Sequence, residues 1–78
     1  MRNFDDAEGG HWQAALIEGS FGDVALVFGR IGGDQVLMRS MRTEAANFGE
    51  AEQVLVKLDE AGLRAMLAEA RPWKSQGG

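Results

Sequence analysis

The sequence predicts an α+β fold, in which a three-stranded antiparallel β-meander packs against two C-terminal helices. Between residues 11 and 42, apolar residues alternate or cluster as they do in strands, and glycine-rich turn signals interrupt them. After Thr43 the apolar residues recur every three or four positions, as on one face of an amphipathic helix. The chain has 78 residues and no internal repeat or linker, so we expect one domain with the order β-β-β-α-α.

The strands are expected at 11–18, 24–28 and 36–42. In the first, apolar residues alternate with a mixed set on the other face. The second, Val24–Phe28, is apolar on both faces, which is typical of a central strand covered on each side or facing a partner subunit. Residues 20–23 supply a turn before it, and Gly32-Gly33-Asp34 is a strong hairpin signal after it.

The first helix is predicted around residues 51–58 from an apolar stripe, with Asn47 or Gly49 at its start. Alternation over the same residues leaves a fourth strand as an alternative, but the surrounding Glu, Ala and Gln favour a helix. Asp59 is a suitable N-cap for a second helix over 60–70. Pro72 disfavours helical geometry at Arg71 and ends that helix.

Both ends of the chain are expected to lie outside the ordered domain. Residues 1–10 are acidic, end in two glycines and lack periodicity, so we interpret them as a flexible N-terminal segment. The single α+β domain then covers residues 11–73, and residues 74–78 form a flexible C-terminal tail. Trp73 is expected to fold back onto the sheet or a helix.

The residue types available for catalysis are few. The chain has no cysteine and no tyrosine, and its only histidine is His11. Most covalent and acid–base catalysis draws on such side chains, so we expect no enzymatic activity. The acids before His11 (Asp5, Asp6 and Glu8) match no metal-binding loop, and a solvated acidic tail is the preferred interpretation. We expect neither a metal nor a cofactor.

Charge and hydropathy indicate where the protein acts. The net charge is −4, which disfavours general binding to nucleic acid. No apolar stretch approaches the roughly 20 residues that cross a bilayer, and the N-terminus lacks the core of a secretory signal. The absence of cysteine fits a reducing compartment. We therefore expect a cytoplasmic protein.

One short motif has a counterpart in a known family. Residues 28–32 (Phe-Gly-Arg-Ile-Gly) are similar to the core motif of WGR domains, and Trp12 upstream adds to the likeness. Phenylalanine stands in place of the defining tryptophan, and the later basic and aromatic positions of that family are missing. The resemblance implies a nucleic-acid-associated module in which Arg30 takes part. It covers only this stretch and does not assign the chain to the family.

Two sets of residues are candidates for binding. An apolar set resembles the anchors of protein interfaces: Trp12, Phe28, Met38, Met41 and Trp73. It predicts a small interaction module that associates through the face or the edge of its sheet. A homodimer is favoured because two short helices cannot cover both faces of the sheet. A basic set is the alternative, as a nucleic-acid contact: Arg30, Arg39 and Arg42. By alternation Arg39 and Arg42 lie on opposite faces, and Asp34 or Glu44 could pair with these arginines.

Overall fold

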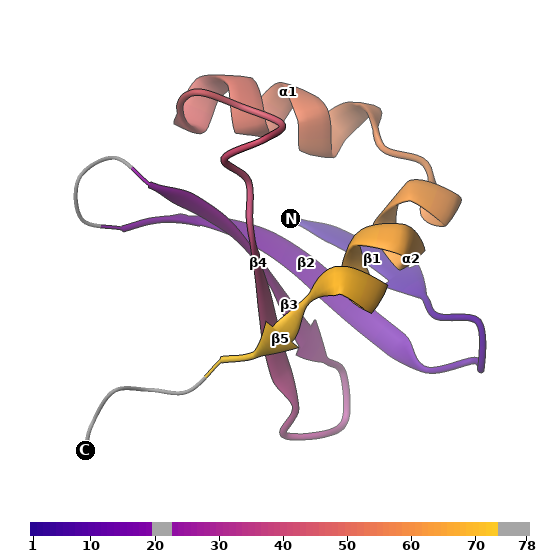
Figure 1. Ribbon diagram of the computed structural model, residues 1–78. Helices are drawn as coiled ribbons and strands as arrows, with labels where there is room; N and C mark the ends of the chain where they lie inside the picture. The colour runs from indigo at the N-terminus through magenta and orange to yellow at the C-terminus, as the bar shows by residue number, and fades with distance from the viewer. Residues whose placement is uncertain (20–22, 74–78) are drawn as a thin grey trace, which may run out of the picture.

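The computed structural model describes residues 1–19 and 23–73 and consists of one antiparallel sheet with two helices (Figure 1). The sheet has five strands: β1 (Arg2–Asp5), β2 (His11–Glu18), β3 (Val24–Arg30), β4 (Val36–Ser40) and β5 (Arg71–Pro72). They lie side by side in chain order, each antiparallel to the next. The helices are α1 (Phe48–Lys57) and α2 (Glu60–Glu69), and both precede β5 in the sequence.

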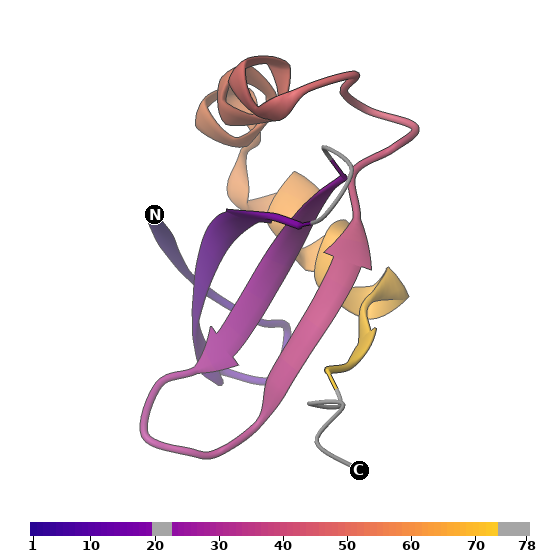
Figure 2. The ribbon, with the colours of Figure 1, turned by 90° about the vertical axis from the view of Figure 1, so that its left-hand side faces the viewer.

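The hydrophobic core lies between the helices and one face of the sheet. Alternate residues of the strands point into this core, namely Phe4, Trp12, Ala14, Val24, Leu26 and Phe28. From the other side α1 contributes Ala51 and Leu55, and α2 contributes Leu63 and Met66. Figure 2 shows α2 behind β3 and β4, with no element in front of these two strands. The helices therefore form a single layer on one face.

The predicted α+β class is confirmed. The predicted number of strands, three, is wrong, because the sheet has five. The first additional strand is β1, which lies in the segment that we interpreted as a flexible lead-in. Phe4 is only 3% exposed, is paired with Trp12 across the strands, and packs edge-on against Phe28 with 5.8 Å between ring centroids. Burial of this single aromatic ring attaches an otherwise acidic segment to the sheet.

The second additional strand, β5, is a two-residue edge that follows α2. Pro72 lies opposite Leu37, and Arg71 lies opposite Met38. Proline is tolerated at a sheet edge because its missing N–H would have faced outward. Trp73 continues along this edge, where its backbone N–H donates to the Val36 carbonyl at 2.9 Å. Trp73 does return to the sheet, as expected, although its side chain stays 46% exposed.

The segment around residues 51–58 is helical, as predicted, and is not a fourth strand. It forms the C-terminal part of α1, which ends at Lys57 with Leu58 as its C-cap. The Asn47 side chain accepts the Glu50 N–H, and the Glu50 carboxylate in turn accepts the Ala46 N–H. The predicted cap of α2 is also confirmed, because Asp59 accepts the Gly62 N–H. These contacts satisfy backbone donors that a helix start leaves free.

The bounds of β2 agree with the prediction, whereas the C-terminal ends of β3 and β4 differ from it. β3 continues two residues beyond Phe28 to Arg30, and β4 ends at Ser40 rather than at Arg42. The β3–β4 hairpin contains Gly32 with a φ of 84°, a conformation that glycine adopts without strain. The expected turn at 20–23 falls mostly outside the described residues, as does the expected tail at 74–78.

Candidate interaction surface

The face of the sheet opposite the helices is apolar at its centre. We call it the open face and define it by the alternate residues of three strands: Gln13, Ala15 and Ile17 on β2, Ala25, Val27 and Gly29 on β3, and Val36, Met38 and Ser40 on β4. None of these side chains is charged. No helix or strand of the part that the structure describes covers this face.

The strand register arranges the open face in three rows. Val27 is at the centre, with Ala15 on one side and Met38 on the other. The row above joins Ile17, Ala25 and Ser40, and the row below joins Gln13, Gly29 and Val36. Most of these side chains are only partly exposed, because neighbours on a pleated surface shield each other. The side chains of the open face are therefore partly buried by one another and partly exposed to solvent.

Charged groups lie at the margins of the open face. Asp5 and His11 form an exposed pair with 2.7 Å between Oδ1 and Nδ1 at the corner where β1 meets β2. Arg71 lies beside Met38 at the β5 edge. At the end where β3 begins, Arg42 and Asp23 lie 4.0 Å apart beside a shallow hollow of about 270 Å³. An apolar centre with a charged rim is the usual anatomy of a protein interface.

The five interface candidates from the sequence divide between the core and the surface. Trp12, Phe28 and Met41 are at most 3% exposed and belong to the core, so their assignment to an interface is corrected. Met38 lies on the open face, and Trp73 lies beside Val36 of that face at the β5 edge. The interface candidates did not include Ala15, Ile17 and Val27, although the doubly apolar Val24–Phe28 segment indicated that one of its faces stays open.

The three arginine candidates do not form one patch. Arg30 lies over the Trp12 ring at 5.7 Å from its centroid, at the end of β3. Arg42 is near Asp23, at the start of β3, and seven residues of strand separate these ends by about 20 Å. Arg39 points toward the helices instead, where Nε lies 2.7 Å from Glu69. The structure therefore disperses the basic set over both faces and both ends of the sheet.

Arg39 forms a bidentate ion pair with Glu44, one of the two acids that the sequence offered as partners for the arginines. Two guanidinium nitrogens donate to the two carboxylate oxygens of Glu44, each at 2.9 Å. This bidentate contact lowers the pKa of Glu44 to about 2 and raises the pKa of Arg39. The Arg39 side chain is 16% exposed, so it is used for internal structure and is not free to bind phosphate.

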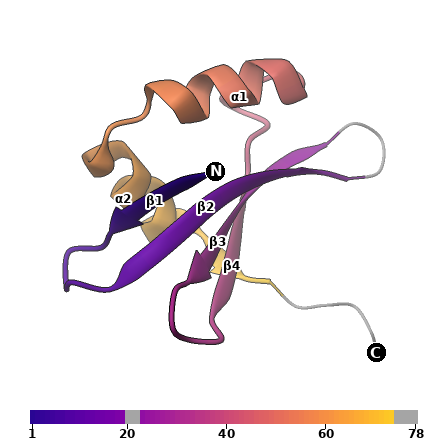
Figure 3. The ribbon, with the colours of Figure 1, turned by 180° about the vertical axis from the view of Figure 1, so that it is seen from behind.

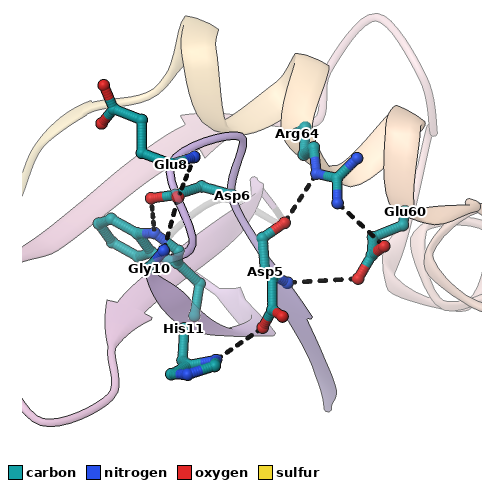
Figure 4. A network of polar contacts seen from close by, with 8 residues as sticks. Asp5, Asp6, Glu8, Gly10, His11, Glu60 and Arg64 are labelled. Carbon is teal, nitrogen blue, oxygen red and sulfur yellow. Dashed lines mark hydrogen bonds and ion pairs between the residues drawn. The ribbon is translucent and has the colours of Figure 1, made fainter.

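The acidic residues near the N-terminus also have structural roles (Figure 4). The Asp6 carboxylate accepts hydrogen bonds from the Trp12 indole at 2.8 Å and from the Gly10 and Glu8 N–H groups. These donors, the indole first, lower the pKa of Asp6. Arg64 of α2 donates to the Asp5 carbonyl at 2.7 Å and ties this corner to the helix layer. Among residues 1–19 and 23–73, no cluster of three or more potential ligands could hold a metal ion.

Comparison with known proteins gave no match, whether with protein-family models, curated proteins or solved structures. The similarity of residues 28–32 to the WGR motif therefore has no support from a family model. In the described residues, neither α1 nor α2 combines the length and the apolarity that a membrane-crossing helix needs.

Proposed function

We propose that the protein is a small non-enzymatic interaction module that forms a homodimer through its open face. The observation that carries the proposal is the uncharged patch across β2, β3 and β4, which the single helix layer leaves uncovered. Removing apolar surface from water is the main driving force of association. A second copy of the sheet would supply a matching flat, apolar surface, as the two sheets of a β-sandwich do.

A twofold arrangement fits the side chains of this face. If the axis runs parallel to β3, the central strand lies over its own copy and β2 lies over β4 of the second copy. Ala15 then lies opposite Met38 of the other copy, and Val27 lies opposite Val27. Small side chains facing large ones allow the two layers to interdigitate. This complementarity supports a second copy as the partner.

The size of the patch sets the expected affinity. Three strands at about 4.8 Å spacing and five residues at about 3.3 Å rise give a patch of roughly 15 Å by 17 Å. Such an area is well below the roughly 800 Å² per partner of a standard interface, so we expect weak association, with a dissociation constant on the order of 100 µM. Each copy carries a net charge of −4, and this repulsion is screened by salt. We therefore expect the dimer to strengthen as salt is added.

Sedimentation equilibrium between about 10 µM and about 1 mM tests the proposal, because this range brackets a dissociation constant on the order of 100 µM. The wild type should shift from monomer to dimer over this range. Val27→Lys places a charge at the centre of the open face and should give a monomer throughout. Val56→Lys is the matched control, since Val56 is 72% exposed on α1, away from the open face. A wild type that stays monomeric, or a control that dissociates as Val27→Lys does, contradicts the proposal.

Binding of nucleic acid through Arg30, Arg39 and Arg42 was the alternative expectation, and both the dispersion of these residues and the pairing of Arg39 with Glu44 and Glu69 weigh against it. It requires affinity for oligonucleotides that falls steeply as salt increases. The dimer has the opposite dependence on salt. An anisotropy titration with a labelled oligonucleotide at low and at high salt tests the nucleic-acid alternative, and the absence of binding at low salt contradicts it.

A further inference from the structure

We propose that the shallow hollow at one end of the open face is the binding site for Arg42 of the second copy, whose guanidinium pairs there with Asp23. We call this feature the end hollow. Among the residues that line it are Ile17, Gly19, Asp23, Ala25, Met38 and Arg42. The inference rests on the proposed homodimer. It adds which ends of the two copies meet and which ion pairs join them.

The strand register places Asp23 and Arg42 in line with the rows of the open face. They follow the Ala25–Ser40 pair of β3 and β4 by two residues, so Arg42 comes opposite Asp23. On the other side of Asp23, its carbonyl accepts the N–H of Gly19 at 2.7 Å. Because alternate residues of a strand share a face, these three residues form one more row of the open face. This end of the sheet, where β2 ends and β3 begins, lies on the side away from α2 (Figure 3).

The ion pair within one copy leaves both partners available for a closer contact. Arg42 Nε and Asp23 Oδ1 lie 4.0 Å apart, beyond the range of a hydrogen bond, and both side chains are exposed. By comparison, Arg39 Nε lies only 2.7 Å from Glu69 Oε1. The Asp23 carboxylate can therefore accept hydrogen bonds from the guanidinium of a second copy.

The twofold arrangement proposed above brings such a guanidinium to Asp23. With the axis parallel to β3, each row of the open face lies opposite the same row of the second copy, and β4 of the second copy lies over β2. Arg42 of the second copy then lies over Gly19. A Cβ atom at Gly19 would have only the Asp23 carbonyl oxygen within 4 Å, at 3.8 Å, so this position leaves room for a long side chain.

The end hollow suits the chemistry of an arginine side chain. It has a volume of about 270 Å³, with apolar walls from Ile17, Ala25 and Met38 and a carboxylate at Asp23. An arginine offers an aliphatic stem and a planar cationic end that binds carboxylates. The stem would pack against the apolar walls while the guanidinium pairs with the carboxylate. By symmetry the contact forms twice.

Charge and side-chain size favour this arrangement over a twofold axis that runs across the strands at Val27. That axis would put the end hollow over the β3–β4 hairpin of the second copy, with Arg71 facing Arg71 and Met38 facing Met38. Like charges would then meet at the β5 edge. The axis parallel to β3 also brings the two Asp23 carboxylates together, but it places an Arg42 guanidinium beside each of them.

Sedimentation equilibrium of two charge variants, alone and as an equimolar mixture, tests this contact. Asp23→Lys makes both charged side chains of the end hollow basic, and Arg42→Glu makes both acidic. Each variant alone brings like charges together, so we expect its dimer to be about fivefold to tenfold weaker than that of the wild type at about 0.1 M salt. In the mixture a basic end meets an acidic end, and we expect association within about threefold of the wild type. Neither variant retains an ion pair within its own copy, so this recovery reports contact between copies.

Glu52→Lys is the matched control, because Glu52 is exposed on α1, away from the open face. This variant and Asp23→Lys both change the net charge of each copy from −4 to −2, which by itself favours association. We therefore expect the control to dimerise at least as tightly as the wild type and Asp23→Lys to dimerise less tightly. The difference should shrink at about 1 M salt, where the Debye length falls to about 3 Å.

Circular dichroism confirms that each variant is folded. A wild type that stays monomeric overturns the homodimer and this inference with it. A wild-type dimer whose mixed variants associate no more tightly than either variant alone overturns only the inference. The same holds if Asp23→Lys dimerises as tightly as Glu52→Lys, since net charge alone would then explain the result.

Discussion

The buried indole of Trp12 donates its hydrogen bond to the carboxylate of Asp6, with 2.8 Å between Nε1 and Oδ2. Trp12 is 3% exposed, so its N–H group has no ready access to water. The same carboxylate accepts hydrogen bonds from the N–H groups of Glu8 and Gly10 and so stabilises the turn between β1 and β2. One acidic side chain thus joins the segment before His11 to the core.

Replacement of this carboxylate should destabilise the fold. Asp6→Ala leaves the buried indole N–H without its partner, so we expect a lower free energy of unfolding than in the wild type. Asp6→Asn should also lose stability, because its one amide oxygen cannot replace two accepting oxygens. Urea denaturation followed by tryptophan fluorescence measures both. Glu8→Ala, an exposed carboxylate in the same turn, is the control and should stay within about 0.5 kcal/mol of the wild type.

The role of β1 is tested by Phe4→Ala. A phenylalanine this deeply buried should cost about 3–5 kcal/mol when truncated, because the cavity adds to the lost transfer free energy. A domain of this length has a total stability of only about 4–12 kcal/mol, so the variant should unfold at much lower urea. Asn3→Ala, on the opposite face of the same strand, is the matched control. If both variants behave like the wild type, β1 does not belong to the stable sheet.

The Arg39–Glu44 pair predicts a specific dependence of stability on pH. The pKa of Glu44 falls from its ordinary value of 4.5 to about 2 in the folded protein. The unfolded chain therefore binds more protons in this window, and the contribution of the pair is complete above pH 4.5 and lost as the pH falls toward 2. Glu44→Gln should cost about 1–2 kcal/mol at neutral pH and progressively less as the pH falls through 2.

Thermal or urea unfolding across this pH range measures the difference between Glu44→Gln and the wild type. Glu69→Gln is the control, because Glu69 contacts the same arginine with a side chain that is 63% exposed. It should cost less than about 0.5 kcal/mol at neutral pH. A cost of Glu44→Gln that persists unchanged at low pH would mean that the charge of Glu44 does not stabilise the fold.

Local patterns were sufficient for most of the regular structure. The alternation in 11–18, the hairpin glycines and the caps Asn47 and Asp59 act within a few residues of the sequence, so their effect can be read locally. β1 could not be found in this way, because Phe4 stands alone among acids. Its place depends on the distant partners Trp12 and Phe28.

The surface was harder to predict than the elements, for a related reason. The apolar residues of β2 and β3 occupy both faces, and only the position of the helices decides which face is buried. Trp12 and Phe28 point toward the helices, whereas Val27 points away. An ion pair of the arginine candidates with Glu44 was expected from the sequence, but the choice of Arg39 and its second contact with Glu69 on α2 required the tertiary fold.

The most direct test of the open face as a dimer interface is an isotope-filtered NMR experiment on mixed copies. One copy carries ¹³C-labelled methionine methyl groups, and the other is unlabelled. Met38 is on the open face, whereas Met41 and Met66 are buried in the core and serve as internal controls. We predict intermolecular contacts from the Met38 methyl to alanine and valine protons of the second copy, and none from Met41 or Met66. If Met38 gives no such contact at millimolar concentration, the open face is not the dimer interface.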